Sequence, residues 1–110
     1  MSFLVDTGAD YTVVHPRDML NLGIRASYHF TGSAALSSQG IGGSAEIFPE
    51  PCDLFLEHDD GTIDQLALTI YFASPNSVND QYPSLLGRDV LSYYRFTFHQ
   101  ASGLVTLDVP

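Results

Sequence analysis

The stretch FLVDTGADYTVV, residues Phe3 to Val14, is the segment that decides the fold. Three apolar residues lead into Asp6-Thr7-Gly8-Ala9, and a run rich in aromatic and β-branched residues follows. This pattern predicts a strand, a tight loop and a second strand. Gly8 permits loop conformations that a side chain would forbid. The Asp6 carboxylate is therefore expected between two apolar strands, where it needs a partner, a proton or a function.

The motif Asp6-Thr7-Gly8-Ala9-Asp10 resembles the active-site loop of the retropepsin-like (retroviral-type) aspartic proteases. Two later segments resemble the same family in the same order. Gln39-Gly40-Ile41-Gly42-Gly43 is similar to its glycine-rich flap tip, and Ser84 to Leu91 is similar to the apolar-apolar-glycine segment that enters its helix. The resemblance implies a mainly β fold, a retropepsin-like closed β domain forming a single acid-protease lobe, with one or two short helices.

The resemblance also implies a catalytic site at Asp6, Thr7 and Gly8. Aspartic proteases use two carboxylates that share one proton. Because this chain carries one Asp-Thr-Gly motif, the resemblance implies a homodimer in which Asp6 meets Asp6 of a second copy. The alternative is that Asp6 is a loop residue that binds nearby backbone amides. Thr7 would brace the partner's loop, or would simply fill the end of a strand.

Substrate contacts are expected at Ala9 and Asp10 and at the flap residues Gly40, Ile41, Gly42 and Gly43. A lid must open for substrate and close over it, and glycine gives it that freedom, while Ile41 supplies an apolar contact at the tip. The alternative is a glycine-rich hairpin without a function.

Structural support for the Asp6 loop is expected from Leu85, Leu86, Gly87 and Arg88. The two leucines would pack behind the loop, and Gly87 would allow a close backbone approach. The resemblance implies that Arg88 pairs with Asp10, since a guanidinium can hold a carboxylate with two parallel hydrogen bonds. In a buried setting, the loss of Arg88 would cost about 3–5 kcal/mol. Two separate surface charges are the alternative.

The remaining sequence predicts a single domain over residues 1–110. A helix is expected from His15 to Gly23, with Pro16 at its first position and Met19, Leu20 and Leu22 facing the core. Pro49 and Pro51 predict a bend or a sheet edge. The other expected elements are a strand at 25–31, a hairpin at 32–48, strands at 52–57 and 62–72 joined by the Asp-Gly turn 58–61, a polar loop at 74–83, a helix at 88–93 and a hairpin at 95–109.

Composition excludes several classes of function. The net charge is −9, with four Arg and no Lys, which argues against nucleic acid and anionic membranes as partners. The lone Cys52 cannot form an internal disulfide, and neither a leader nor a long apolar run is visible, so we expect a cytoplasmic protein. The four histidines lack metal-ligand spacing, and no cofactor is expected. The expected partners are a second copy and a peptide or protein substrate.

The sequence departs from the family before Asp6, where only Met1 to Val5 precede the motif. Against the family's pattern, a first strand and a following hairpin are missing, through truncation or replacement. The final hairpin or strand exchange would then have to complete the dimer interface. The main hypothesis is an aspartic endopeptidase; a catalytically silent retropepsin-like dimerisation or peptide-binding domain and an unrelated β domain with an accidental match are the alternatives.

Overall fold

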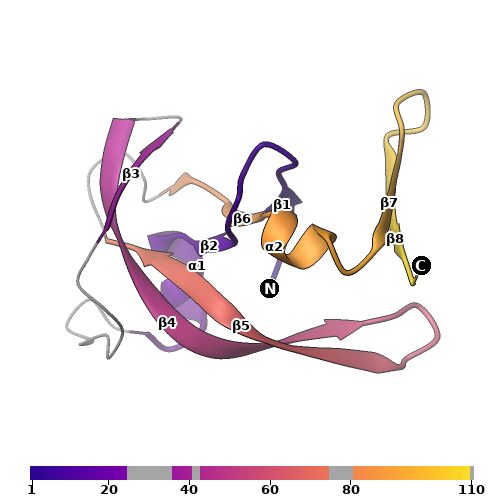
Figure 1. Ribbon diagram of the computed structural model, residues 1–110, viewed down its shortest axis with the longest axis horizontal. Helices are drawn as coiled ribbons and strands as arrows, with labels where there is room; N and C mark the ends of the chain where they lie inside the picture. Colours follow the sequence, from indigo (N-terminus) through magenta and orange to yellow (C-terminus); the bar gives the residue numbers. More distant parts are fainter. Residues whose placement is uncertain (25–35, 41–42, 75–80, 110) are drawn as a thin grey trace.

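The computed structural model describes residues 1–24, 36–40, 43–74 and 81–109, and it is mainly β (Figure 1). The predicted strand at 25–31, Ile41 and Gly42 of the predicted flap tip, and residues 75–80 of the predicted loop lie outside this part. The elements are β1 (Phe3–Val5), β2 (Val13–Val14), α1 (Pro16–Asn21), β3 (Leu36–Gly40), β4 (Gly43–Glu57), β5 (Ile63–Ala73), β6 (Ser84–Leu86), α2 (Arg88–Leu91), β7 (Arg95–His99) and β8 (Leu104–Asp108).

Six strands form one sheet in the order β1-β6-β2-β5-β4-β3, and β7 pairs with β8 in a second sheet. β6 lies between the two strands that flank the Asp6 loop: it runs parallel to β1, with Leu4 opposite Leu85, and antiparallel to β2, with Val13 opposite Leu85. The predicted strand, loop and strand around Asp6 are therefore confirmed. The insertion of β6, some eighty residues later in the chain, places its end directly beneath that loop (Figure 1).

β4 and β5 form a long twisted hairpin, and its predicted turn is confirmed (Figure 1). The His58 amide donates to the Thr62 carbonyl at 2.7 Å, and the Gly61 amide donates to the His58 carbonyl at 2.9 Å. Gly61 has a φ of +88°, in the left-handed region that favours glycine. The Asp-Gly pair thus supplies the conformation that the turn requires.

A bend or a sheet edge was predicted at Pro49 and Pro51. The bend is wrong, because β4 continues through both residues. The edge is confirmed for the described part of the chain, because β3 pairs with β4 only as far as Ile47. Hydrogen bonds between Ser74 and Glu46 and between His58 and Thr62 place the even-numbered residues of β4 in hydrogen-bonded pairs with β5. Pro49 and Pro51 therefore occupy non-hydrogen-bonded positions, opposite Tyr71 and Thr69, where no amide proton is required.

The core consists of two apolar clusters. One contains Val14, Met19, Ile70 and Phe72, and the other contains Leu86, Val90 and Leu91. Phe3, Leu54 and Leu68 pack against both clusters, so the two adjoin each other, and Phe3 on β1 joins them to the strand that leads into the Asp6 loop.

Helix α1 confirms the predicted position of Pro16 and the end before Gly23, which has a φ of +77°. Met19 is buried as predicted, but the prediction for Leu20 and Leu22 is wrong, since they are 70% and 50% exposed. In a six-residue helix only one narrow stripe can face the sheet. Met19 takes that stripe, and Leu20, the next residue, points about 100° away from it. Leu22 is the C-cap residue after the helix has ended.

The C-terminal hairpin of β7 and β8 follows α2, which is shorter than predicted and ends at Leu91. Asp64 Oδ2 on β5 accepts a hydrogen bond from the Tyr94 hydroxyl at 2.7 Å and lies 2.7 Å from His58 Nε2. This carboxylate connects the tip of the β4–β5 hairpin to the segment that enters β7. Neither described helix is long and apolar enough to cross a membrane.

Candidate functional site

The Asp6 loop begins where β1 ends, and its backbone is tied to β6. The Asp6 amide donates to the Leu86 carbonyl at 3.0 Å, and the Ala9 amide donates to the Asp6 carbonyl at 3.2 Å. The Gly8 amide donates to Asp6 Oδ1 at 3.0 Å, which is the loop bond considered above as an alternative to catalysis. The Asp6 side chain is half-buried and Thr7 is exposed, so the carboxylate remains accessible from solvent.

Gly87 supports this loop as predicted. A Cβ atom at this position would lie 2.5 Å from the backbone carbon and oxygen of Tyr11. No side chain can be accommodated at that distance unless the backbone moves. Leu86 is buried and Leu85 is half-buried, and β6, which carries both, pairs with β1 before the loop and with β2 after it.

A hydrogen-bonded cluster of Thr12, Gly87 and Asp89 was not predicted from the sequence. The Thr12 hydroxyl donates to Asp89 Oδ1 at 2.7 Å, and its amide donates to Asp89 Oδ2 at 3.0 Å. The same hydroxyl accepts from the Gly87 amide at 3.1 Å. Thr12 is fully buried, so the cluster fixes the distance between β2 and α2. The sequence feature that could have indicated this cluster is Thr12 itself, a hydroxyl residue directly before the apolar strand β2.

The predicted contact between Asp10 and Arg88 is present, but it lies at the surface. Arg88 Nη2 contacts Asp10 Oδ1, with the side chains 57% and 67% exposed respectively. Two backbone bonds join the same segments: the Arg88 amide donates to the Ala9 carbonyl at 2.9 Å, and the Asp89 amide donates to the Asp10 carbonyl at 3.3 Å. The predicted pair therefore lies outside the buried setting in which its loss would be most costly, and backbone hydrogen bonds join the same two segments.

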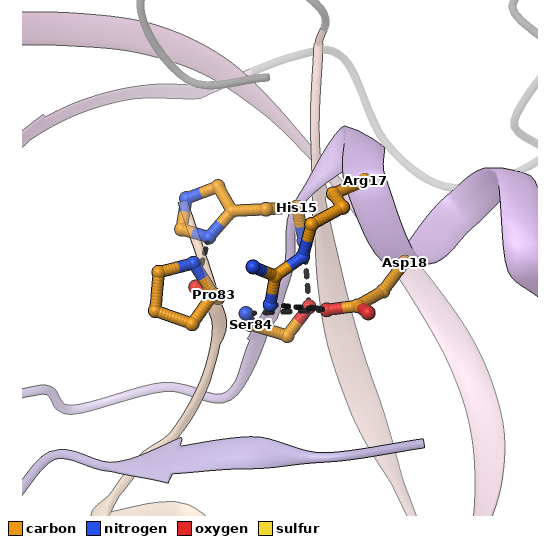
Figure 2. A network of polar contacts seen from close by, with 5 residues as sticks. All are labelled: His15, Arg17, Asp18, Pro83 and Ser84. Carbon is orange, nitrogen blue, oxygen red and sulfur yellow. Dashed lines mark hydrogen bonds and ion pairs between the residues drawn. The ribbon is translucent and has the colours of Figure 1, made fainter. Parts of the chain in front are cut away.

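A second polar cluster fastens α1 to β6 (Figure 2). The fully buried Ser84 hydroxyl donates to Asp18 Oδ2 at 2.6 Å and accepts from the His15 amide at 3.0 Å. His15 Nδ1 lies 2.7 Å from the Pro83 carbonyl oxygen. Although serine, histidine and aspartate meet here, this is not a catalytic triad, because the serine hydroxyl faces the carboxylate and not the imidazole. The cluster positions the helix.

The predicted flap is described in part. Strands β3 and β4 form an antiparallel hairpin in which Gly40 is opposite Gly43 and Gln39 is opposite Ser44. Ile41 and Gly42 lie between these strands, outside the described residues. β4 is joined through β5 to β2, so the hairpin and the Asp6 loop belong to one sheet.

The site thus offers one accessible carboxylate on a loop held from below by β6 and α2. A single carboxylate can orient water, but proton sharing between two acids requires a second carboxylate at hydrogen-bond distance. In the described part of the chain, no group of three His, Cys, Asp or Glu side chains is placed to hold a metal ion.

Comparisons with protein-family models, with curated proteins and with solved structures found no match for this chain.

Proposed function

We propose that this chain is a retropepsin-like aspartic endopeptidase domain that acts as a homodimer. The observation that carries the proposal is the contact between two motifs separated in sequence: Asp6 binds Leu86 through its backbone, and Gly87 packs against Tyr11. The segments that resemble one family in sequence are neighbours in the fold. The closed form of the domain and the role of the β3–β4 hairpin as a flap belong to the same proposal.

In the proposed mechanism, Asp6 of each copy contributes one carboxylate to a shared dyad. One carboxylate is ionised and accepts a proton from the water whose oxygen attacks the carbonyl carbon, while the protonated one donates to the carbonyl oxygen. The tetrahedral intermediate then breaks its C–N bond as the leaving nitrogen takes a proton from the dyad, and the carbonyl of the new acid re-forms as its hydroxyl proton returns to the dyad. The substrate is an extended peptide beside Ala9 and Asp10, covered by the hairpin that ends at Gly40 and Gly43. These steps use protein carboxylates and water alone. The proposed compartment is the cytoplasm, where a lone thiol such as Cys52 persists reduced.

The test is cleavage of a peptide library by wild-type protein and by Asp6→Asn. The substitution keeps the shape of the side chain but removes the group that shares the proton, so turnover should vanish. Asp53→Asn, on the exposed face of β4, is the matched control and should cleave at the wild-type rate. A peptide that mimics the tetrahedral transition state should inhibit the wild type. Equal cleavage by wild type and Asp6→Asn would refute the proposal.

The bond from the Gly8 amide to Asp6 Oδ1 favours a second candidate, a catalytically silent domain of the same family type. In that case Asp6 shapes the loop and the domain binds peptides or a second copy without cleaving them. Tight binding of the transition-state mimic without cleavage of its peptide counterpart would select this candidate. Asp6→Asn, which keeps an oxygen acceptor for Gly8, should then leave both folding and binding intact.

A further inference from the structure

The outward face of the β4–β5 hairpin is uncovered over much of its length. Because successive residues of a strand point to opposite faces, the hairpin has two distinct sides. On one side Leu54, Leu56, Leu66 and Leu68 are half-buried and pack against the core clusters. We call the other side the outer face. Each of its residues is exposed: Pro51, Asp53, Phe55, Glu57, Ile63, Gln65, Ala67 and Thr69.

Two large apolar side chains lie on this outer face. Phe55 and Ile63 are each 61% exposed. Phe55 is opposite Gln65 and Ile63 is opposite Glu57, so the two residues are diagonal neighbours, typically about 7–8 Å apart. They form one apolar patch at the end of this sheet face that adjoins the turn. Contact with an apolar partner would remove the exposed surface of both side chains from water, which is favourable.

The patch is surrounded by negative charge. Asp53 and Glu57 lie on either side of Phe55 along the same face. Residues 43–74 contain no Lys or Arg and seven acidic residues: Glu46, Glu50, Asp53, Glu57, Asp59, Asp60 and Asp64. A partner that carries apolar side chains flanked by Lys or Arg is complementary to this arrangement, whereas an acidic partner is repelled.

The size of the face selects a short segment as the partner. Seven residues of strand extend about 23 Å, and two strands are about 10 Å wide, so the face covers about 230 Å². A stable interface between folded proteins buries about 800 Å² on each partner. A second copy of this chain would also bring the same negative charge to the contact. The outer face therefore fits a basic peptide segment better than a folded copy.

The strand edge beside this face offers amide donors only in part. Pro49 and Pro51 lack amide protons, whereas Asp53, Phe55 and Glu57, whose amides point to the same edge, retain theirs. The contacts specific to the outer face are its side chains, which are apolar at Phe55 and Ile63 and negative at Asp53 and Glu57.

We propose that the outer face of the β4–β5 hairpin is a docking surface for a basic amphipathic segment of a partner protein. Phe55 and Ile63 anchor its apolar side chains, and Asp53 and Glu57 hold its Lys or Arg side chains. The surface is separate from the Asp6 loop. Docking there is independent of proteolysis, and Asp6→Asn should bind the same segment equally well.

The test uses three synthetic peptides of one length and measures binding to the full chain by calorimetry. A Lys/Leu amphipathic peptide should bind. A Glu/Leu peptide with the same apolar positions should not bind, and a Lys/Ser peptide with the same charges should bind at least tenfold more weakly. Amide shifts in nuclear magnetic resonance spectra should change at 53–57 and 63–67. Equal binding of the Lys/Leu and Lys/Ser peptides would refute the proposal.

Two variants and a control locate the contact. Phe55→Thr/Ile63→Thr keeps strand-forming residues and should weaken Lys/Leu binding roughly tenfold. Asp53→Asn/Glu57→Gln should weaken it at low salt and flatten its salt dependence. Leu20→Gln/Leu22→Gln removes exposed leucines from another surface and should leave the affinity unchanged. Three outcomes would each overturn the proposal. They are equal losses of affinity in all three variants, amide shifts confined to other strands, and a change in oligomeric state caused by Phe55→Thr/Ile63→Thr.

Discussion

Thr12 and Asp89 are 77 positions apart in the sequence, and both the amide and the hydroxyl of Thr12 donate to the Asp89 carboxylate. The hydroxyl also accepts a bond from the Gly87 amide. The buried Thr12 side chain therefore links three parts of the fold: β2, which follows the Asp6 loop, Gly87 beneath that loop, and the first turn of α2. The position of the candidate catalytic loop depends on this cluster more than on the exposed Asp10–Arg88 pair.

Replacement of Thr12 by Val should destabilise the fold by about 1–3 kcal/mol, because Val keeps the shape but leaves the buried Gly87 amide without a partner. It also removes one of the two hydrogen bonds to Asp89 Oδ1, which still accepts from the Val90 amide. Thr12→Ser keeps the hydroxyl and is the matched control, with a smaller loss from the missing methyl group. Urea denaturation measures both. A Val variant as stable as the Ser variant would show that the hydroxyl bonds are not important.

Replacement of Gly87 by Ala should displace the Asp6 loop. The new Cβ atom would lie 2.5 Å from backbone atoms of Tyr11, which cannot yield as a flexible side chain can. Overpacking of this kind costs about 1–3 kcal/mol. Gly61→Ala is the control: its positive φ makes it strained by about 1 kcal/mol, but its surroundings are open.

The two glycine variants should perturb different parts of the protein. Amide shifts of Asp6 and Tyr11 should change in Gly87→Ala and stay unchanged in Gly61→Ala. If Gly87→Ala left these amides in place, the close approach between α2 and the loop would not be required for the loop's position.

The sequence predicted the features that depend on local chemistry. Three of them follow from backbone conformation: the strand, loop and strand around Asp6, the Asp-Gly turn at Gly61, and Pro16 at the start of α1. These signals act within a few residues, so they can be read without knowledge of the fold.

The features that the sequence did not predict depend on tertiary context. Pro49 and Pro51 fit in β4 only because the register with β5 places them where no amide proton is needed. Leu20 has the residue type of a core position, yet α1 is too short to bury it. The partners of Thr12 are more than seventy positions away. In each case pairing partners set the outcome, and a single sequence does not specify them.

Removal of Arg88 should cost little stability, about 0–1 kcal/mol, because the ion pair with Asp10 is exposed. The backbone bonds from residues 88 and 89 to Ala9 and Asp10 do not depend on the side chain. Thermal melts of Arg88→Ala and Arg88→Lys should differ slightly at low salt and coincide at high salt. A loss in Arg88→Ala near the buried-pair value of about 3–5 kcal/mol would show that the pair is shielded from solvent.

The contact between Tyr94 and Asp64 should make stability depend on pH at the alkaline end. Burial, together with the Asp64 carboxylate, raises the pKa of Tyr94 from 10.0 to about 12. A raised pKa means that the neutral phenol is favoured in the folded state, so its contribution is complete below pH 10 and is lost as the pH rises through about 12.

The same contact should also make stability depend on pH at the acidic end, where stability is lost as the pH falls. Hydrogen bonds from Tyr94 and then from His58 lower the pKa of Asp64, so this contribution is present above the ordinary carboxylate range and is lost as the pH falls through the lowered value. Denaturant unfolding of Tyr94→Phe should show a flatter pH dependence at both ends than wild type. Tyr93→Phe, at an exposed neighbouring position, should behave as wild type. Identical profiles for Tyr94→Phe and wild type would exclude this role.

If the proposed function is right, activity should depend on the assembly of two copies of the chain. One Asp6 per chain cannot form a dyad alone, so specific activity should rise with protein concentration in parallel with the dimer fraction. Phe98 and Val105 are opposite each other on β7 and β8, and both are exposed, which makes this hairpin the expected contact. Phe98→Thr/Val105→Thr should shift both sedimentation and activity to higher concentrations. Added salt should shift both to lower concentrations by screening the charge of −9 on each copy. A monomer that cleaves peptide with constant specific activity over the dilution series would rule out the shared dyad.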